Sequence, residues 1–114
     1  MAEECIFCQI IAKQIPAKLV HEDADCIAFR DINPQAPKHL LLVPRRHIRT
    51  ANDLEAEDAA LVGRLVLVAQ KLAAAEGLGE GYRLVLNCGA WAGQTVWHLH
   101  LHLLGGRPMH WPPG

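Results

Sequence analysis

The segment His98-Leu99-His100-Leu101-His102-Leu103-Leu104 alternates histidine and leucine with a period of two. Because successive side chains of a β-strand point to opposite faces, it predicts a strand with one histidine face and one leucine face, the leucines packing into a core. Neighbouring histidines would lie ~7 Å apart along the backbone, and the outer two ~13 Å apart. A straight strand therefore cannot bring all three to one metal ion, and we expect them to have different roles.

Two interpretations of this histidine row are open. The first is a polar strand face that merely tolerates histidine, which would be the better interpretation for a single residue. The second is a chemical site, which is favoured by three histidines in strict alternation backed by leucines. A neutral imidazole can donate or accept a proton, or attack as a nucleophile, near neutral pH.

The composition limits the class of protein. The chain has 114 residues, 51% of them hydrophobic, and 11 basic side chains against 12 acidic ones give a formal charge of −1. These values exclude a disordered tail, a collagen-like repeat and a coiled coil, and they argue against a purely electrostatic nucleic-acid binder. The length predicts a single domain over residues 1–114, with an irregular C-terminal tail over 105–114.

The chain also lacks the sequence features of membrane insertion and export. No apolar stretch approaches the ~20 residues that span a bilayer, so no membrane partner is expected. The N-terminus, Met1-Ala2-Glu3-Glu4, is acidic and does not resemble a signal peptide. We therefore expect a cytoplasmic protein.

Apolar and β-branched runs between turn residues predict five strands in all. They are expected at residues 18–22, 26–30, 39–43, 82–88 and 96–104. Strands lie in neighbouring pairs, with one long helix between the third and the fourth. The predicted fold class is α+β, with a mainly antiparallel five-stranded sheet, one long helix and a short N-terminal helix.

Helical spacing marks the two helices. Residues 5–13 predict the short one, which ends before Pro16 because the residue preceding a proline disfavours the helical conformation. The long helix is marked by apolar residues at steps of four, three and four, namely Leu61, Leu65, Val68 and Leu72. It is expected to be capped at its start by Asn52 or Asp53 and at its end by Gly77 or Gly79.

With its surroundings, the histidine row resembles the signature of the histidine triad (HIT) family, and within it the Hint branch of nucleotide-binding proteins. The matching surroundings are Asp31-Ile32, Pro37-x-His39, Pro44-x-x-His47-Ile48, Gln94-Thr95-Val96 and the ending Gly105-Gly106-Arg107-Pro108-Met109-x-Trp111-Pro112-Pro113-Gly114. The resemblance implies a HIT-like fold and a homodimer with a purine-nucleotide pocket in each subunit. It also implies an enzyme that hydrolyses nucleoside 5′-phosphoramidates and aminoacyl-adenylates.

The same resemblance assigns catalytic roles to four histidines. His100 would attack the α-phosphorus and form a nucleotidyl-histidine intermediate, which water then cleaves. His102 would donate to the phosphoryl oxygens, and His39 would fix the tautomer of the nucleophile. His98 completes the catalytic set. A protonated neighbour, or a backbone carbonyl near His98, could help to set which nitrogen attacks.

The nucleotide-binding residues are likewise implied by the resemblance. Ile6, Phe7, Phe29 and Ile32 would form an apolar wall around the base, and the Asp31 carboxylate would bind the ribose. Asn87 would lie near the phosphate and the ribose, while Gln94, Thr95 and backbone amides near Gly93 would donate to the phosphoryl oxygens. Ordinary core packing is the alternative for the apolar wall, and turn formation is the alternative for Asp31 and Asn87. Thr95 departs from the family's usual serine, and Trp91 is bulky for its loop.

The Cys5-x-x-Cys8 pair could share a tetrahedral ion, and a structural site needs two more ligands. The resemblance implies that His47 and His98 would supply them, giving a structural zinc that catalysis does not require. The alternative is that both cysteines are small apolar fillers.

Two further interpretations of the chain stay open. The protein could be a nucleotide-sensing or zinc-binding regulatory scaffold with vestigial activity. Basic residues also cluster between positions 38 and 49, namely Lys38, Arg45, Arg46 and Arg49. This cluster could indicate a hydrolase that acts on nucleic-acid ends. We favour a solvated rim beside a phosphate site, because no aromatic stacking platform for nucleic acid accompanies the cluster.

Overall fold

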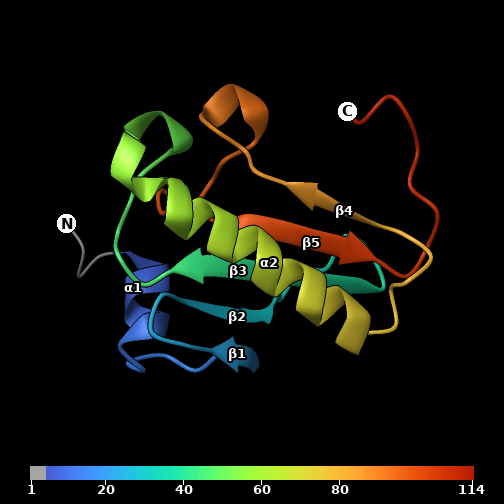
Figure 1. Cartoon of the computed structure of the whole chain (residues 1–114), viewed down its shortest axis with the longest axis horizontal. Helices are drawn as coiled ribbons and strands as arrows, with labels where there is room; N and C mark the ends of the chain where they lie inside the picture. Colours follow the sequence, from blue (N-terminus) through green and yellow to red (C-terminus); the bar gives the residue numbers. More distant parts are fainter. Residues whose placement is uncertain (1–4) are drawn as a thin grey trace.

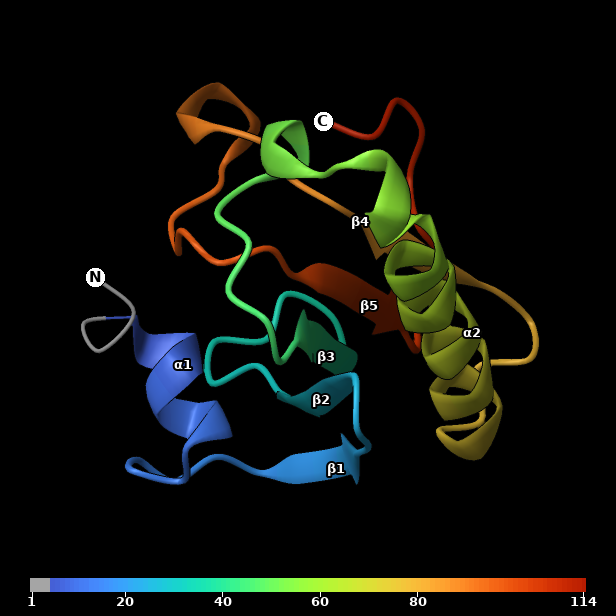
Figure 2. The same cartoon turned by 60° about the vertical axis from the view of Figure 1, so that its left-hand side comes forward.

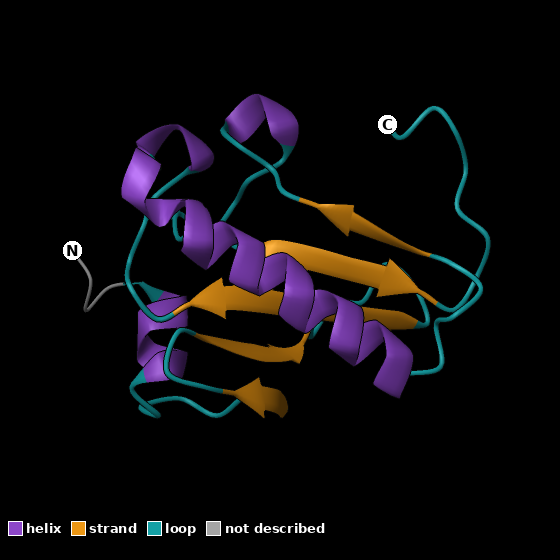
Figure 3. Ribbon diagram, viewed as in Figure 1, coloured by secondary structure: helices purple, strands orange, loops and turns teal. Residues whose placement is uncertain are grey.

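The computed structural model describes residues 5–114. The main elements are α1 (Ile6–Ile11), β1 (Leu19–Glu22), β2 (Cys26–Arg30), β3 (Lys38–Pro44), α2 (Ala59–Ala75), β4 (Tyr82–Val85) and β5 (Leu101–Gly105) (Figures 1 and 3). Short 3-10 helices lie at η2 (Ala51–Asp53), η3 (Ala56–Asp58) and η4 (Ala90–Ala92). The predicted α+β class is confirmed.

All five strands form one antiparallel sheet in the order β1-β2-β3-β5-β4. The long helix α2 crosses one face of this sheet, and the short helix α1 lies on the opposite side (Figure 2). No helix among residues 5–114 is long and apolar enough to cross a membrane.

The period-two alternation of the strands divides the core into two clusters. One packs against α2 and contains buried residues from four elements, among them Ala28, Leu40, Leu42, Leu65, Val68, Leu101 and Leu103. The other packs around α1 and contains Phe7, Ile10, Ile27, Phe29, Leu41 and Val43. The side chains of the histidine row lie on the α1 side, since Leu99, Leu101 and Leu103 all belong to the α2 cluster.

The strand predicted over 96–104 is regular only from Leu101, so this prediction was wrong at its start. The β3–β5 ladder ends at the Leu42–Leu101 pair. Pro44 has no N–H to extend the ladder, and the amide of Leu99 instead donates to the Ile48 carbonyl at 2.6 Å. The leucine–histidine alternation nevertheless persists through this irregular segment, because Leu99 is buried in the α2 cluster at 1% exposure.

The other element boundaries also differ from the predictions. The helix expected over 5–13 spans Ile6–Ile11, and the strand expected over 82–88 spans Tyr82–Val85. The long helix begins at Ala59, because Thr50 caps a separate 3-10 turn over Ala51–Asp53 in which the expected caps lie. Its end was predicted correctly, since Gly77 follows the Glu76 cap with a φ of 77°.

The C-terminal tail has no regular secondary structure after Gly105, which is the last residue of β5. Gly106 turns the chain with a φ of 95°, and a Cβ there would lie 2.8 Å from Cβ of Pro37. Two arginines fix the tail, because Arg107 donates to the Gln35 carbonyl at 3.0 Å and Arg83 donates to the His110 carbonyl at 2.6 Å.

Candidate active site and metal-ligand cluster

His100 is buried at 7% exposure, and its ring packs edge-on against Phe7 of α1 with centroids 5.0 Å apart. Its Nδ1 lies 2.7 Å from the backbone carbonyl oxygen of His98. A carbonyl only accepts, so Nδ1 carries the proton and donates it. Neutral His100 therefore has an unprotonated Nε2 with a free lone pair, which is the form that a nucleophile needs.

His102 belongs to a different chain of hydrogen bonds. The amide of Gln35 donates to Nδ1 of His39 at 3.0 Å, so neutral His39 carries its proton on Nε2. That nitrogen lies 2.9 Å from Nδ1 of His102 and donates to it. His102 consequently carries its own proton on Nε2 and can donate it to a ligand.

The contact of His39 differs from the predicted one. It was expected to fix the tautomer of His100, but its ring contacts His102, and the carbonyl of His98 orients His100 instead. Asp31 extends the series of contacts that links Gln35, His39 and His102, because its Oδ2 lies 3.4 Å from Nε2 of His39. The carboxylate thus supports the histidine that orients His102.

Burial keeps these histidines neutral. Desolvation lowers the pKa of His102 to about 4, with smaller contributions in the same direction from His100 and His39. Desolvation also lowers the pKa values of His100 and His39, although the Asp31 carboxylate opposes both shifts. Near neutral pH, His100 therefore presents an Nε2 lone pair and His102 presents an Nε2–H donor. The centroids of these two rings are 4.9 Å apart.

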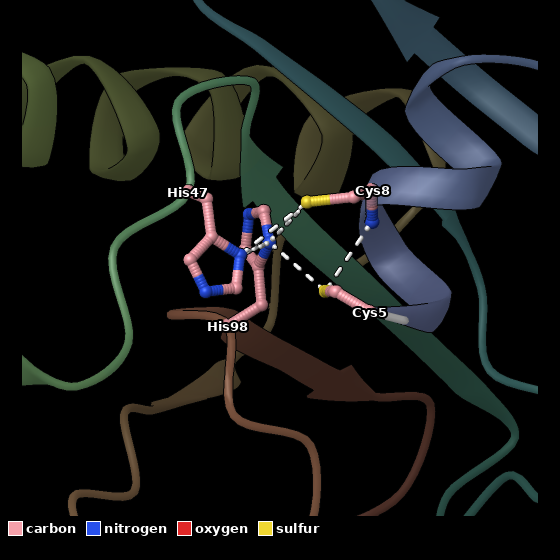
Figure 4. A group of neighbouring side chains, drawn as sticks. All are labelled: Cys5, Cys8, His47 and His98. Carbon is pink, nitrogen blue, oxygen red and sulfur yellow. Dashed lines mark hydrogen bonds between the residues drawn. The ribbon is translucent and has the colours of Figure 1, made fainter. Parts of the chain in front are cut away.

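His98 points instead into a cluster with Cys5, Cys8 and His47 (Figure 4). The four ligand atoms all lie within 4.8 Å of one another. Nδ1 of His98 is 3.4 Å from Cys5 Sγ, 3.6 Å from Cys8 Sγ and 3.1 Å from Nδ1 of His47, and Cys8 Sγ is 3.3 Å from that same nitrogen.

These separations fit a tetrahedral ion. Zinc bond lengths imply ligand edges of about 3.6 Å between sulfur and nitrogen and about 3.3 Å between two nitrogens. The ring of His98 is also prepared for this role, because its Nε2–H donates to the Pro44 carbonyl at 2.8 Å and leaves the Nδ1 lone pair free. Two thiolates and two neutral imidazoles would balance the charge of Zn²⁺.

A second group with metal-ligand atoms, formed by His21, Asp23 and Cys26, was not expected from the sequence. The Asp23 carboxylate already accepts the amides of Asp25 and Cys26, His21 at 2.7 Å and Arg64 at 3.1 Å. Burial alone would raise its pKa, but these hydrogen bonds lower it well below the usual range. We interpret the group as the brace of the β1–β2 turn.

The predicted nucleotide-binding residues lie in three environments. Phe7 and Phe29 are buried in the α1 cluster, with their ring centroids 5.5 Å apart. Both are therefore core residues that offer little exposed surface to a base. Ile6 is 46% exposed and Ile32 is 99% exposed, so both offer free apolar surface. The remaining candidates, Asn87, Gly93 and Thr95, are partly or fully exposed and lie on the chain between β4 and β5.

Gln94, predicted to donate to the phosphate, is buried at 3% exposure. Its Nε2 donates to the carbonyls of Arg49 and Val96 at 3.0 and 3.1 Å, and its Oε1 accepts the amide of Gly89 at 2.9 Å. Both amide protons of the side chain therefore have acceptors within the protein. In this structure Gln94 braces the loop that carries Gly93 and Thr95.

A pocket of about 380 Å³ lies beside the metal-ligand cluster. It was not predicted from the sequence. It is lined by Cys5, Ile6, His47, Arg49, Thr95, Val96 and Trp97. The guanidinium carbon of Arg49 lies 4.5 Å from the ring centroid of Trp97. The 48 positions that separate these two residues explain why no sequence pattern joined them.

Comparisons with known proteins place the chain in a family. The HIT domain model matches residues 12–109. An uncharacterized HIT-like protein of Synechocystis sp. is 54% identical over 114 residues, which cover all of both chains. The chain therefore belongs to the HIT domain family.

Solved structures of related proteins have the same fold. A HIT family hydrolase from Legionella pneumophila is 56% identical and has a TM-score of 0.95, with 96% of this chain and 99% of that chain covered. A histidine triad nucleotide-binding protein from Candida albicans is 31% identical and has a TM-score of 0.81, with 95% of this chain and 82% of that chain covered.

Proposed function

We propose that this protein hydrolyses purine nucleoside 5′-phosphoramidates, and also aminoacyl-adenylates, as a member of the Hint branch. The observation that carries the proposal is the tautomer of His100, whose Nδ1–H donates to the His98 carbonyl and leaves Nε2 unprotonated. The names of the Legionella hydrolase and the Candida nucleotide-binding protein support a nucleotide hydrolase at the coarser level.

The proposed reaction has two displacements. Nε2 of His100 attacks the α-phosphorus, so a nitrogen–phosphorus bond forms and the bond to the leaving group breaks. The amine of a phosphoramidate takes up a proton as it leaves, and the water of the second displacement gives one up; an aminoacyl-adenylate loses its carboxylate instead. Water then attacks the nucleotidyl-histidine, which releases the nucleoside 5′-monophosphate and restores His100. The Nε2–H of His102 donates to the phosphoryl oxygen, where negative charge increases in each transition state.

The decisive variant is His100→Ala. We expect it to lose at least ~10³-fold in kcat for adenosine 5′-phosphoramidate, because the covalent route disappears. Mass spectrometry of the acid-quenched wild-type enzyme should show an adenylyl adduct that the variant lacks. Full activity in His100→Ala would refute the nucleophile, whereas barely detectable activity in the wild type would favour the regulatory scaffold with vestigial activity.

We also propose that Cys5, Cys8, His47 and His98 bind a structural zinc ion. Their mutual distances match a tetrahedral ligand set, and none of the reaction steps above uses the metal. Burial and the neighbouring Cys5 raise the pKa of the Cys8 thiol to about 11, so zinc binding should release protons.

Metal analysis of the purified protein tests the zinc proposal. Wild type should contain about one zinc per chain, and Cys5→Ser well under half of that. Cys88→Ser is the matched control, because Cys88 lies outside the cluster. Equal zinc in wild type and Cys5→Ser would show that the ligand set is wrong.

A homodimer completes the proposed function. Large apolar side chains are exposed on α2, on β4 and just after β4, including Leu67 at 54% and Tyr82 at 40%. Burial of such a surface against a second copy would be favourable. Gel filtration should give the size of two chains, and a monomer-sized peak would contradict the dimer.

A further inference from the structure

The C-terminal tail packs against the loop over residues 31–37, which joins β2 to β3. Because the last residue of β5 pairs with the first residue of β3, the tail leaves the sheet at the end where this loop lies (Figure 1). Gly106 lies so close to Pro37 that a Cβ on the glycine would be 2.8 Å from the proline Cβ. The next residue, Arg107, donates from Nη2 to the backbone carbonyl of Gln35 at 3.0 Å. Two successive tail residues therefore contact the loop.

The guanidinium of Arg107 is held by the tail itself. Its Nη1 donates to the Pro108 carbonyl at 3.1 Å and to Sδ of Met109 at 3.5 Å, while Nη2 reaches across to the loop. The side chain is exposed, so water screens its charge. Its effect on the loop is therefore mainly geometric, since a planar guanidinium can bond to acceptors on two sides at once.

Gln35 connects this contact to the active site. Its amide donates to Nδ1 of His39 at 3.0 Å, and Nε2–H of His39 donates to Nδ1 of His102 at 2.9 Å. The amide and the carbonyl of Gln35 are rigid peptide groups joined through one Cα, so fixing the carbonyl limits the directions in which the amide can point. Successive hydrogen bonds thus link Arg107 to His102 through the backbone of Gln35 and the ring of His39.

The position of the Gln35 amide decides which nitrogen of His102 carries a proton. The loop has no regular secondary structure and Gln35 is exposed, so the amide depends on such contacts for its position. If the amide moved away, Nδ1 of His39 could carry the proton, and Nε2 of His39 would become an acceptor. Nδ1 of His102 would then donate to it, and Nε2 of His102 would have no proton to give to a phosphoryl oxygen.

We propose that Arg107 is a positioning residue, which acts through the backbone of Gln35 to keep His39 in the tautomer that leaves a proton on Nε2 of His102. This inference rests on the proposed hydrolysis, in which that proton is donated to the phosphoryl oxygen. Within residues 5–114, Arg107 bonds to Gln35 and to its own tail, and not to the candidate base or ribose residues. Its loss should therefore lower kcat more than it changes KM.

Kinetics with adenosine 5′-phosphoramidate test this role. Arg107→Met keeps the length of the side chain without its donors, and it should lose about 10-fold in kcat with KM within about twofold of the wild type. Arg107→Lys keeps a charged donor and should recover most of this loss. A raised KM with unchanged kcat in Arg107→Met would overturn the proposal, because the loop would then act on substrate binding and not on the donor.

Arg83→Met is the matched control. It removes the other arginine that fixes the tail, whose bond goes to the His110 carbonyl and not to the loop, and it should keep the wild-type kcat. The same loss of kcat in Arg83→Met as in Arg107→Met would show a general effect of the tail, and it would overturn the specific link through Gln35.

Nitrogen-15 NMR of histidine-labelled protein measures the tautomers without any need for activity. Near neutral pH the wild type should show His39 and His102 protonated at Nε2, with the signals assigned by His39→Gln and His102→Gln. Arg107→Met should show a substantial fraction of His102 protonated at Nδ1, and tautomers identical to those of the wild type would refute the positioning role. A wild type that does not hydrolyse adenosine 5′-phosphoramidate is a separate result, which would refute the proposed function while the NMR spectra still decide the role of Arg107.

Discussion

The histidine row, in which His98 and His100 are buried and His102 is partly buried, should make this protein sensitive to mild acid. An ordinary histidine has a pKa of 6.5, whereas burial lowers that of His102 to about 4. Between these values the unfolded chain binds a proton that the folded chain does not, so the free energy of unfolding decreases as the pH falls. The stabilisation is complete above pH 6.5 and is lost progressively down to about pH 4.

The magnitude follows from the two pKa values. For His102 alone, the free energy of unfolding should decrease by about 2 kcal/mol between pH 7.5 and pH 5.0. The lowered pKa values of His39 and His100 act in the same direction and add to this loss. A loss of this size is a substantial part of the total stability of a small domain.

Urea unfolding monitored by tryptophan fluorescence, at one protein concentration and several pH values, measures this loss. His102→Gln should flatten the profile, while His110→Gln removes an exposed histidine of the tail and should leave it unchanged. If the free energy of unfolding stays constant within about 0.5 kcal/mol from pH 7.5 to 5.0, the row is not buried and neutral as argued. A decrease that begins only near pH 4 would point to carboxylates instead.

Three substitutions test the fold around the site. Gly63→Ala should stabilise the protein by about 0.5–1 kcal/mol in thermal unfolding, because a Cβ at this helical position meets nothing within 4 Å. Gly106→Ala should destabilise it by about 1–3 kcal/mol, because the positive φ and the close Pro37 ring both oppose a side chain. Gln94→Glu should cost about 2–3 kcal/mol, because a carboxylate cannot donate to the Arg49 carbonyl, and unchanged stability would contradict the bracing role.

The alternation of histidine and leucine predicted the face of each side chain but not the start of β5. The faces depend only on the local period, and they persist where the strand is irregular. The start depends on Pro44, which lacks the N–H to extend the ladder, and on Ile48, whose carbonyl accepts the Leu99 amide; both lie more than fifty positions earlier. The α2 start was misplaced for a similar reason, since Thr50 forms a separate cap that separates Asn52 from the helix.

The site shows the same division between local and distant information. The spacing of Cys5 and Cys8 indicated a shared ion, but the resemblance was needed to add His47 and His98, which the fold then brings within contact. The side chain of Gln94 could not be assigned from its neighbours, because its acceptor on Arg49 lies 45 positions away. A polar residue in a conspicuous motif can therefore be a structural brace. Only its hydrogen-bond partners distinguish such a residue from one that binds a ligand.

The three histidines of the row acquire different chemistry because each ring has a different first partner. His98 and His100 each donate to a backbone carbonyl, but through opposite nitrogens, so one presents Nδ1 to the thiols and the other presents Nε2 as a lone pair. His102 accepts from His39 and therefore presents a proton. The His98 carbonyl sets the His100 tautomer, and the ring of His98 belongs to the metal-ligand cluster. Any displacement of the His98 ring should therefore also affect the nucleophile His100.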